Sequence, residues 1–132
     1  MQGEPNLSIL LASMAPVLNE GEYVFCAVKN MTQINPAEII FFFKEAEAIT
    51  IIVKKTTADK YHLKYLFVAA WLTLTVHSSL EAVGLTAAFS TALGNEGIGC
   101  NVVAAFYHDH IFVATGDAQK ALDVLKKLAA SG

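Results

Sequence analysis

The residue types best suited to chemistry lie just before a helical pattern in the second half of the chain. Ser78 and Glu81 are three residues apart, which is capping-box spacing, and Gly84 follows them. The start of a helix presents unpaired amides and a positive dipole end, which together favour a carboxylate. Glu81 could pair with an ammonium group, and Gly84 lets a ligand approach the backbone closely. This combination suits a small zwitterion such as a free amino acid.

The predicted binding site also takes in the strand that follows this helix. Asn101 is expected on an adjacent strand, where its amide can both donate to and accept from an amino-acid head group. The predicted ligand-binding residues are Ser78, Ser79, Leu80, Glu81, Ala82, Val83, Gly84, Asn101 and Val102. The alternative is purely structural: Ser78 and Glu81 cap the helix, and Gly84 relieves packing.

A histidine-rich stretch raises the question of a metal site. His108 and His110 are two apart in Tyr107-His108-Asp109-His110, so on a continuous strand they share a face. A third ligand would have to come from His62 or His77. The alternative, a polar hairpin tip without metal, is favoured, and no metal or cofactor is expected.

Signals for catalysis are weak. The sequence contains no Gly-x-Ser-x-Gly elbow, no phosphate-binding Gly-x-x-x-x-Gly-Lys loop and no Rossmann glycine pattern. Cys26 and Cys100 lie in apolar, β-patterned runs, where a buried and reduced thiol is the ordinary state. The alternative is a disulfide between them. No catalytic residue is predicted, and the chain is not expected to be an enzyme.

The amino-acid composition limits the kinds of partner that this chain is expected to bind. The 132 residues fit one domain or two small modules, and 55% hydrophobic residues exclude disorder. The net charge is −3 and all nine cations are lysines, which argues against nucleic acids and anionic membranes. The uncharged run 65–80 is short for a membrane span, and no basic segment precedes the apolar run 7–17. We therefore expect a cytoplasmic protein.

The first half of the chain is predicted to alternate short helices and strands. A helix over 6–18 begins at Asn6, and Pro16 is expected to end or kink it near Ala15. The remaining elements are a strand over 23–28, a helix over 36–46 capped by Asn35, a strand over 49–53, a short helix over 56–62 and a strand over 67–76. A strand is the alternative for the aromatic centre of 36–46, and a central hairpin is not evident in this half.

The second half is more regular. It continues with a helix over 85–93, a hairpin of strands over 98–106 and 111–114, and a last helix from Gly116 with Ala121, Leu122, Leu125 and Leu128 inward. From Trp71 the order is strand, helix, strand, strand, helix. That is the ferredoxin-like βαββαβ plan of an α+β protein without its last strand. The missing edge has to come from the N-terminal half or a partner, or stay open.

The second half resembles an ACT domain, with Gly84 at the strand–helix junction and Gly97-Ile98 before the second strand. The whole chain resembles short, stand-alone bacterial tandem ACT proteins, through residues 22–26, 77–88, 100–104 and 107–110. The resemblance implies two tandem units sharing a core, residues 1–66 as an incomplete or rearranged unit and residues 67–132 as an ACT domain. It implies a regulatory sensor of a small ligand, often an amino acid, without catalytic activity.

Three consecutive phenylalanines, Phe41, Phe42 and Phe43, cannot all face one core. At least one is expected at the surface or at an interface, which favours a homodimer. The competing function is therefore a protein–protein interaction module, or scaffold, that binds no metabolite.

Overall fold

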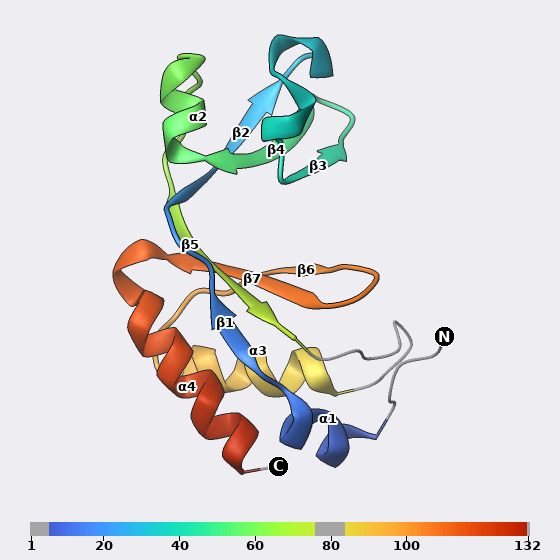
Figure 1. Cartoon of the computed structure of the whole chain (residues 1–132), viewed down its shortest axis with the longest axis vertical. Helices are drawn as coiled ribbons and strands as arrows, with labels where there is room; N and C mark the ends of the chain where they lie inside the picture. Colours follow the sequence, from blue (N-terminus) through green and yellow to red (C-terminus); the bar gives the residue numbers. More distant parts are fainter. Residues whose placement is uncertain (1–5, 76–83, 132) are drawn as a thin grey trace. The chain divides into compact units, whose positions relative to one another are not determined.

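The computed structural model describes residues 6–75 and 84–131, and Figure 1 labels its helices and strands. The chain forms two compact units. One, here called the composite unit, consists of Met1–Glu20 with Ala70–Gly132, and the other, the inserted unit, is Gly21–Ala69. Strand β5 (Val68–Leu74) begins in the inserted unit and ends in the composite unit. The division into residues 1–66 and 67–132 remains a prediction.

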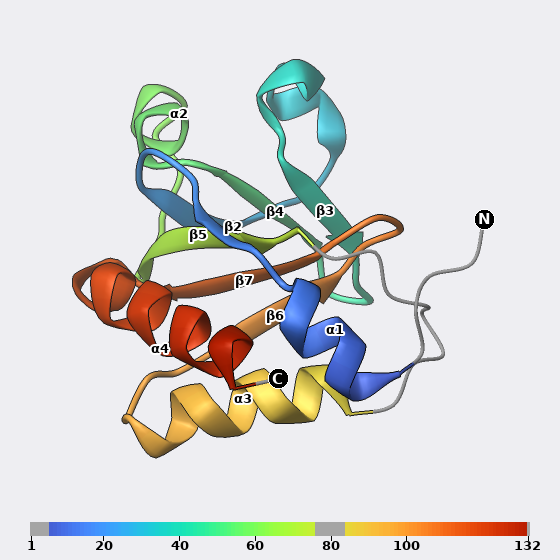
Figure 2. The ribbon, with the colours of Figure 1, turned by 60° about the horizontal axis from the view of Figure 1, so that its bottom comes forward.

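The composite unit is a sheet with helices. Besides β5 its elements are α1 (Leu7–Ser13), β1 (Pro16–Leu18), α3 (Leu85–Asn95), β6 (Asn101–Ala104), β7 (Asp109–Ala114), a 3₁₀ turn (Thr115–Asp117) and α4 (Ala118–Ala130). The strand order is β5-β7-β6, and β1 also pairs with β5. Figure 2 shows α1, α3 and α4 on one side of these strands. This is the predicted ferredoxin-like plan.

The edge strand that the C-terminal half lacks comes from the N-terminal segment. Strand β1 pairs antiparallel with β5, with Pro16 opposite Leu74 and Leu18 opposite Leu72. Of the three alternatives for this edge, the structure therefore shows the first, a strand from the N-terminal half. Strand β1 also explains why α1 is short: the residue before a proline avoids helical geometry, and Pro16 already starts the strand. Helix α1 ends at Ser13, whereas the predicted end was near Ala15.

The inserted unit is also α+β. Its elements are β2 (Tyr23–Val28), two 3₁₀ turns (Met31–Gln33 and Pro36–Glu38), β3 (Phe41–Lys44), β4 (Ile49–Lys54) and α2 (Lys55–Lys60). The strand order is β3-β4-β2, followed by the start of β5, and β3, β4 and β2 pair antiparallel. The predicted strands over 23–28 and 49–53 and the predicted short helix are confirmed.

The predicted helix over 36–46 is wrong beyond its first turn. Asn35 does act as the cap, because its Oδ1 accepts from the amide of Ala37 at 3.0 Å. The turn ends at Glu38, however, and Phe41–Lys44 pairs with β4. Cross-strand pairing of an aromatic run with a β-branched run outweighs the local helical signal. Strands β3 and β4 form the central hairpin that the sequence analysis did not find.

Each unit has its own cluster of buried side chains, where the sequence analysis expected one shared core. The composite unit packs α1, α3 and α4 onto β5 and β7, and the fully buried members of its cluster are Leu10, Leu72, Leu74, Phe89, Leu93, Ile111, Val113, Ala121 and Leu125. The inserted unit packs side chains of β2, β4 and α2 in a second cluster, Val24, Cys26, Val28, Ile34, Ile51, Val53 and Ala58. Ala121 and Leu125 face inward as predicted.

The remaining boundaries differ in detail. Helix α3 continues beyond the predicted end at residue 93 to Asn95, and Gly97 after it is left-handed, with φ 75°. Strand β6 is shorter than the predicted run 98–106. Within the described residues, no helix has the length and apolar character needed to cross a membrane.

Candidate functional site

The candidate site begins at the N-terminus of α3. Gly84 is the N-cap, with φ 103° and ψ −23°, a left-handed conformation that glycine adopts without strain. Its carbonyl accepts from the amide of Ala88 at 2.8 Å, which starts the helix. No side chain of the described residues caps the first turn, and Thr86 and Ala87 are exposed there. These amides are the kind of donors that bind a carboxylate.

Most of the predicted loop lies outside the described residues. This applies to Ser78–Val83, and hence to the predicted capping box and to Glu81 as an ammonium partner. Gly84 is described and lies against α1: a Cβ added to Gly84 would come within 3.2 Å of Cδ2 of Leu7. Gly84 therefore has both a conformational and a packing reason to be glycine.

Asn101 and Val102 lie at the start of β6. Strand β7 lies between β5 and β6, so the expectation that Asn101 is on the strand adjacent to β5 is wrong. Asn101 is exposed, and its Nδ2 donates to the carbonyl of Phe112 at 3.2 Å. Val102 is half-buried against the core of the composite unit. Asn101 can still reach solvent, but part of its hydrogen-bonding capacity is already used.

A buried carboxylate lies at the start of β7. Asp109 is only 7% exposed. Burial raises the pKa of this carboxyl, and the charge of His108 opposes the shift. Asp109 was expected in a polar hairpin tip and is not among the predicted binding residues.

The tip of the β6–β7 hairpin is aromatic rather than polar. The turn closes with a hydrogen bond from the amide of Ala105 to the carbonyl of His108, at 3.1 Å. Phe106 and Tyr107 lie between them and are largely exposed, with ring centroids 4.9 Å apart. His108 follows the turn, and its Nδ1 is buried without a hydrogen-bond partner in the described structure.

His110 belongs to a different cluster. Its Nδ1 accepts from Nε1 of Trp71 at 3.1 Å and lies 3.1 Å from Oγ1 of Thr73. Thr73 in turn accepts from Nδ2 of Asn19 at 2.9 Å. Burial is the main reason that the pKa of His110 is lowered, with the charge of His108 adding to it. The described residues contain no group of three His, Cys, Asp or Glu side chains that could hold a metal ion.

The two cysteines are free thiols. Cys26 is buried and Cys100 is half-buried. Burial raises the pKa of both thiols, which lowers the fraction of nucleophilic thiolate at neutral pH. Neither residue has the low-pKa environment of a reactive cysteine.

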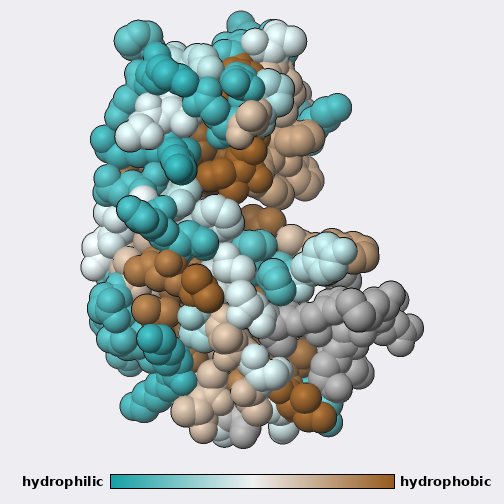
Figure 3. Space-filling model, viewed as in Figure 1, coloured by the Kyte–Doolittle hydropathy of each residue, from teal (hydrophilic) through white to brown (hydrophobic). Residues whose placement is uncertain are grey.

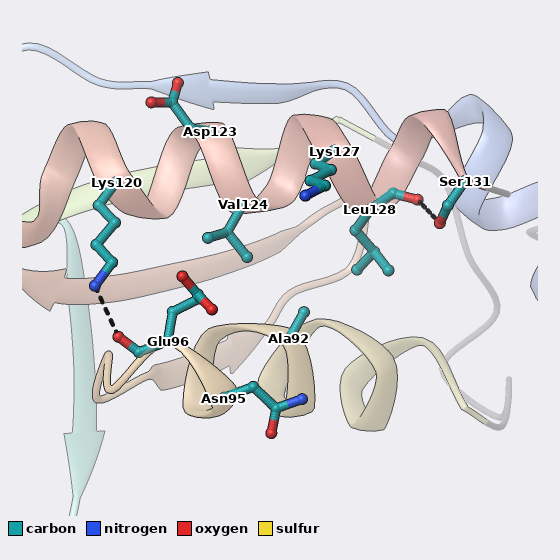
Figure 4. A pocket seen from close by; sticks show the side chains of 9 residues that line it. All are labelled: Ala92, Asn95, Glu96, Lys120, Asp123, Val124, Lys127, Leu128 and Ser131. Carbon is teal, nitrogen blue, oxygen red and sulfur yellow. Dashed lines mark hydrogen bonds between the residues drawn. The ribbon is translucent and has the colours of Figure 1, made fainter.

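A groove of about 510 Å³ runs between α3 and α4 (Figure 4). Its lining residues are Ala92, Asn95, Glu96, Lys120, Asp123, Val124, Lys127, Leu128 and Ser131. Several polar groups of this lining already have partners: Lys120 Nζ donates to the carbonyl of Glu96 at 3.0 Å, and Asp123 accepts from Gln119 at 2.9 Å. On α3 the lining begins at Ala92, about 12 Å along the helix axis from Gly84, and continues to Glu96. It does not coincide with the predicted site.

The fold and the site together define a class of protein. An ACT-domain family model matches residues 2–70 and a second one matches residues 67–127. The chain belongs to the ACT domain family and carries two such domains in tandem. ACT domains are typically regulatory modules that bind small molecules. A comparison with proteins of curated function finds no match.

Solved structures agree with this assignment. The chain is similar to a protein of unknown function from Vibrio cholerae, a possible transport protein, with 45% identity and a TM-score of 0.85. That match covers 93% of this chain and 95% of the Vibrio protein. The ligand-free regulatory subunit of aspartate kinase from Thermus thermophilus shares the fold, with 10% identity, a TM-score of 0.60, and coverage of 89% of this chain and 98% of that one. A protein from Agrobacterium tumefaciens shares it at 16% identity and a TM-score of 0.67, over 88% and 89% of the two chains.

Proposed function

We propose that this tandem ACT protein is a regulatory sensor without catalytic activity, and that it binds a free amino acid. The site is the N-terminal end of α3, formed by residues 78–84 together with Asn101 and Val102. The observation that carries the proposal is the first turn of α3. It begins at Gly84 in a left-handed conformation, has no side-chain cap among the described residues and exposes Thr86 and Ala87.

The chemistry of this helix start fits a carboxylate. The amides of the first turn and the dipole of an 11-residue helix act on the same point. Only glycine at position 84 gives both the left-handed backbone and room beside Leu7. The α3–α4 groove has fewer free polar groups for a ligand, because Lys120 and Asp123 of its lining already make internal hydrogen bonds.

Isothermal titration calorimetry of the protein against each of the twenty amino acids tests this function. We expect saturable binding of at least one amino acid and weaker binding by Glu81→Gln. The matched control is Glu96→Gln, which removes the same charge at the other end of α3 and should bind as the wild type does. An absence of heat with all twenty, from a protein shown to be folded, would contradict the proposal.

A second candidate function is a protein-interaction module, and the surface of the inserted unit favours it. Phe42 and Phe43 are 47% and 59% exposed on β3, the outer strand of the order β3-β4-β2. Figure 3 shows apolar surface on this unit. Edge strands with exposed aromatic side chains are suited to pairing with another chain. We propose that a second copy of this chain, in a homodimer, is the partner.

A further inference from the structure

His110 lies in a hydrogen-bonded cluster that joins three strands of the composite unit. Its Nδ1 accepts from Nε1 of Trp71 on β5 at 3.1 Å, and Oγ1 of Thr73 lies at the same distance from this nitrogen. Asn19, directly after β1, donates from Nδ2 to Oγ1 of Thr73 at 2.9 Å and to the carbonyl of Trp71 at 3.2 Å. Strands β1, β5 and β7 are therefore linked through one imidazole nitrogen and one hydroxyl group.

The two neighbours of Nδ1 differ in their hydrogen-bonding capacity. The indole N–H of Trp71 only donates, whereas the hydroxyl of Thr73 both donates and accepts. An unprotonated Nδ1 accepts from the indole, which is the arrangement in the structure. A protonated Nδ1 cannot accept, and the oxygen of Thr73 is then its neighbouring acceptor. Each protonation state of His110 thus has its own partner at the same distance.

We infer that this cluster is a pH-sensitive switch, in which protonation of His110 moves the hydrogen bond of Nδ1 from Trp71 to Thr73. The proton comes from solvent and binds to Nδ1 of the half-buried imidazole. Nδ1 then donates to Oγ1 of Thr73, and Nε1 of Trp71 loses its acceptor. Because that oxygen already accepts from Asn19, the change involves β1 as well as β5 and β7. The switch does not depend on the proposed ligand.

The charges around His110 set the pH at which it is protonated. The neighbouring strands β1, β5 and β6 contain no ionisable side chain, and Glu20, after Asn19, is exposed. Asp109 shares the face of Ile111, which packs against the helices, so it lies on the opposite face of β7 from His110. Burial lowers the pKa of His110, and the charge of His108 lowers it further. Protonation is therefore expected below pH 6.5, the ordinary value for histidine.

The chain has a single tryptophan, so the indole N–H of Trp71 gives one peak in a proton–nitrogen correlation spectrum. We expect this peak to move upfield in the proton dimension between about pH 7.5 and about pH 5, because its hydrogen bond is lost. The midpoint should lie below pH 6.5, and the peak should return when the pH is raised. A wild type that unfolds before the peak moves, or a peak that stays in place, would overturn the inference.

Two variants separate the switch from a general effect of acid. His110→Asn keeps an acceptor and does not titrate, so its indole peak should stay in place; His110→Gln replaces it if it does not fold. Thr73→Val removes the acceptor of the protonated nitrogen, and its midpoint should be lower by about one pH unit or more. Thr73→Ala is judged in the same way if the valine variant does not fold.

The matched control is Thr75→Val, the same change two residues further along the chain. The hydroxyl of Thr75 donates to the carbonyl of Ala15 at 2.7 Å and makes no contact with His110. We expect its midpoint to equal that of the wild type. Movement of the indole peak in the His110 variant would overturn the switch. A midpoint that is the same in Thr73→Val as in Thr75→Val would overturn the transfer to Thr73.

Discussion

The indole Nε1 of Trp71 donates a hydrogen bond to Nδ1 of His110, at 3.1 Å across β5 and β7. An acceptor Nδ1 means that the proton of this neutral imidazole is on Nε2. Oγ1 of Thr73 lies at the same distance from Nδ1. This cluster therefore needs His110 uncharged, and burial lowers its pKa accordingly.

Stability should consequently fall when the protein is acidified through the ordinary pKa of histidine. The folded-state pKa of His110 lies below 6.5, so below pH 6.5 the unfolded chain takes up a proton that the folded protein resists. His110→Asn keeps an acceptor near the position of Nδ1 and does not titrate. We expect its melting temperature to drop less than that of the wild type between pH 7.5 and about pH 5.5.

The control for this pH series is His62→Asn. His62 belongs to the inserted unit and has φ 56°, a conformation that asparagine tolerates. We expect this variant to follow the wild-type curve. A curve for His110→Asn parallel to that of the wild type would show that another group causes the loss.

Replacement of Gly84 should destabilise the fold. An alanine there would adopt φ 103° with its Cβ 3.2 Å from Leu7, and both effects oppose folding. We expect Gly84→Ala to lower the free energy of unfolding by about 1–2 kcal/mol in chemical denaturation.

Gly94 provides the matched control in the same helix. It has no atom within 4 Å of an added Cβ and lies in the last turn of α3. Gly94→Ala should raise the free energy of unfolding by about 0.5 kcal/mol, because alanine is the better helix former. Equal effects of the two substitutions would contradict the role assigned to the left-handed backbone at Gly84.

Asp109 should lower the stability of the unliganded protein. Burial raises its pKa in the folded state, so its ionised form opposes folding above that pKa, and the penalty disappears as the pH falls below 3.8. We expect Asp109→Asn to raise the melting temperature at pH 7, with a difference from the wild type that shrinks towards pH 4. A lower melting temperature at pH 7 would indicate that the carboxylate has a stabilising partner.

Dimer formation should depend on β3. Phe42→Ser and Phe43→Ser remove exposed apolar surface, so they should shift the protein towards monomer in analytical ultracentrifugation without lowering its melting temperature at high dilution. Leu66→Ser is the control, since Leu66 is fully exposed in the loop before β5. A dimer that survives both phenylalanine substitutions would place the interface elsewhere.

The elements that the sequence predicted well are those whose local signals agree with their packing. Strand β2 has the predicted bounds, Asn6 caps α1, and Ala121 and Leu125 face the core of the composite unit. The predicted helix over 36–46 is wrong because the helical signal of Asn35 and Pro36 extends only over one 3₁₀ turn. The aromatic residues after that turn pair with β4 instead. The pairing partner of this run is β4, which lies outside residues 36–46, so the pattern within that segment does not show the pairing.

The candidate site was only partly predictable for the same reason. The glycine at position 84 and the helix after it are visible in the sequence, but the order β5-β7-β6, which separates Asn101 from β5, is not. Asp109 lies between His108 and His110, and the sequence favours a polar hairpin tip there. Its burial depends on which face of β7 the helices cover, and that is a property of the assembled unit.

The most direct test of the account is a crystal structure of the protein with the amino acid that calorimetry identifies. We predict electron density at the start of α3, with the ligand carboxylate on the first-turn amides near Gly84. Density in the α3–α4 groove between Ala92 and Leu128, with the start of α3 unoccupied, would contradict it.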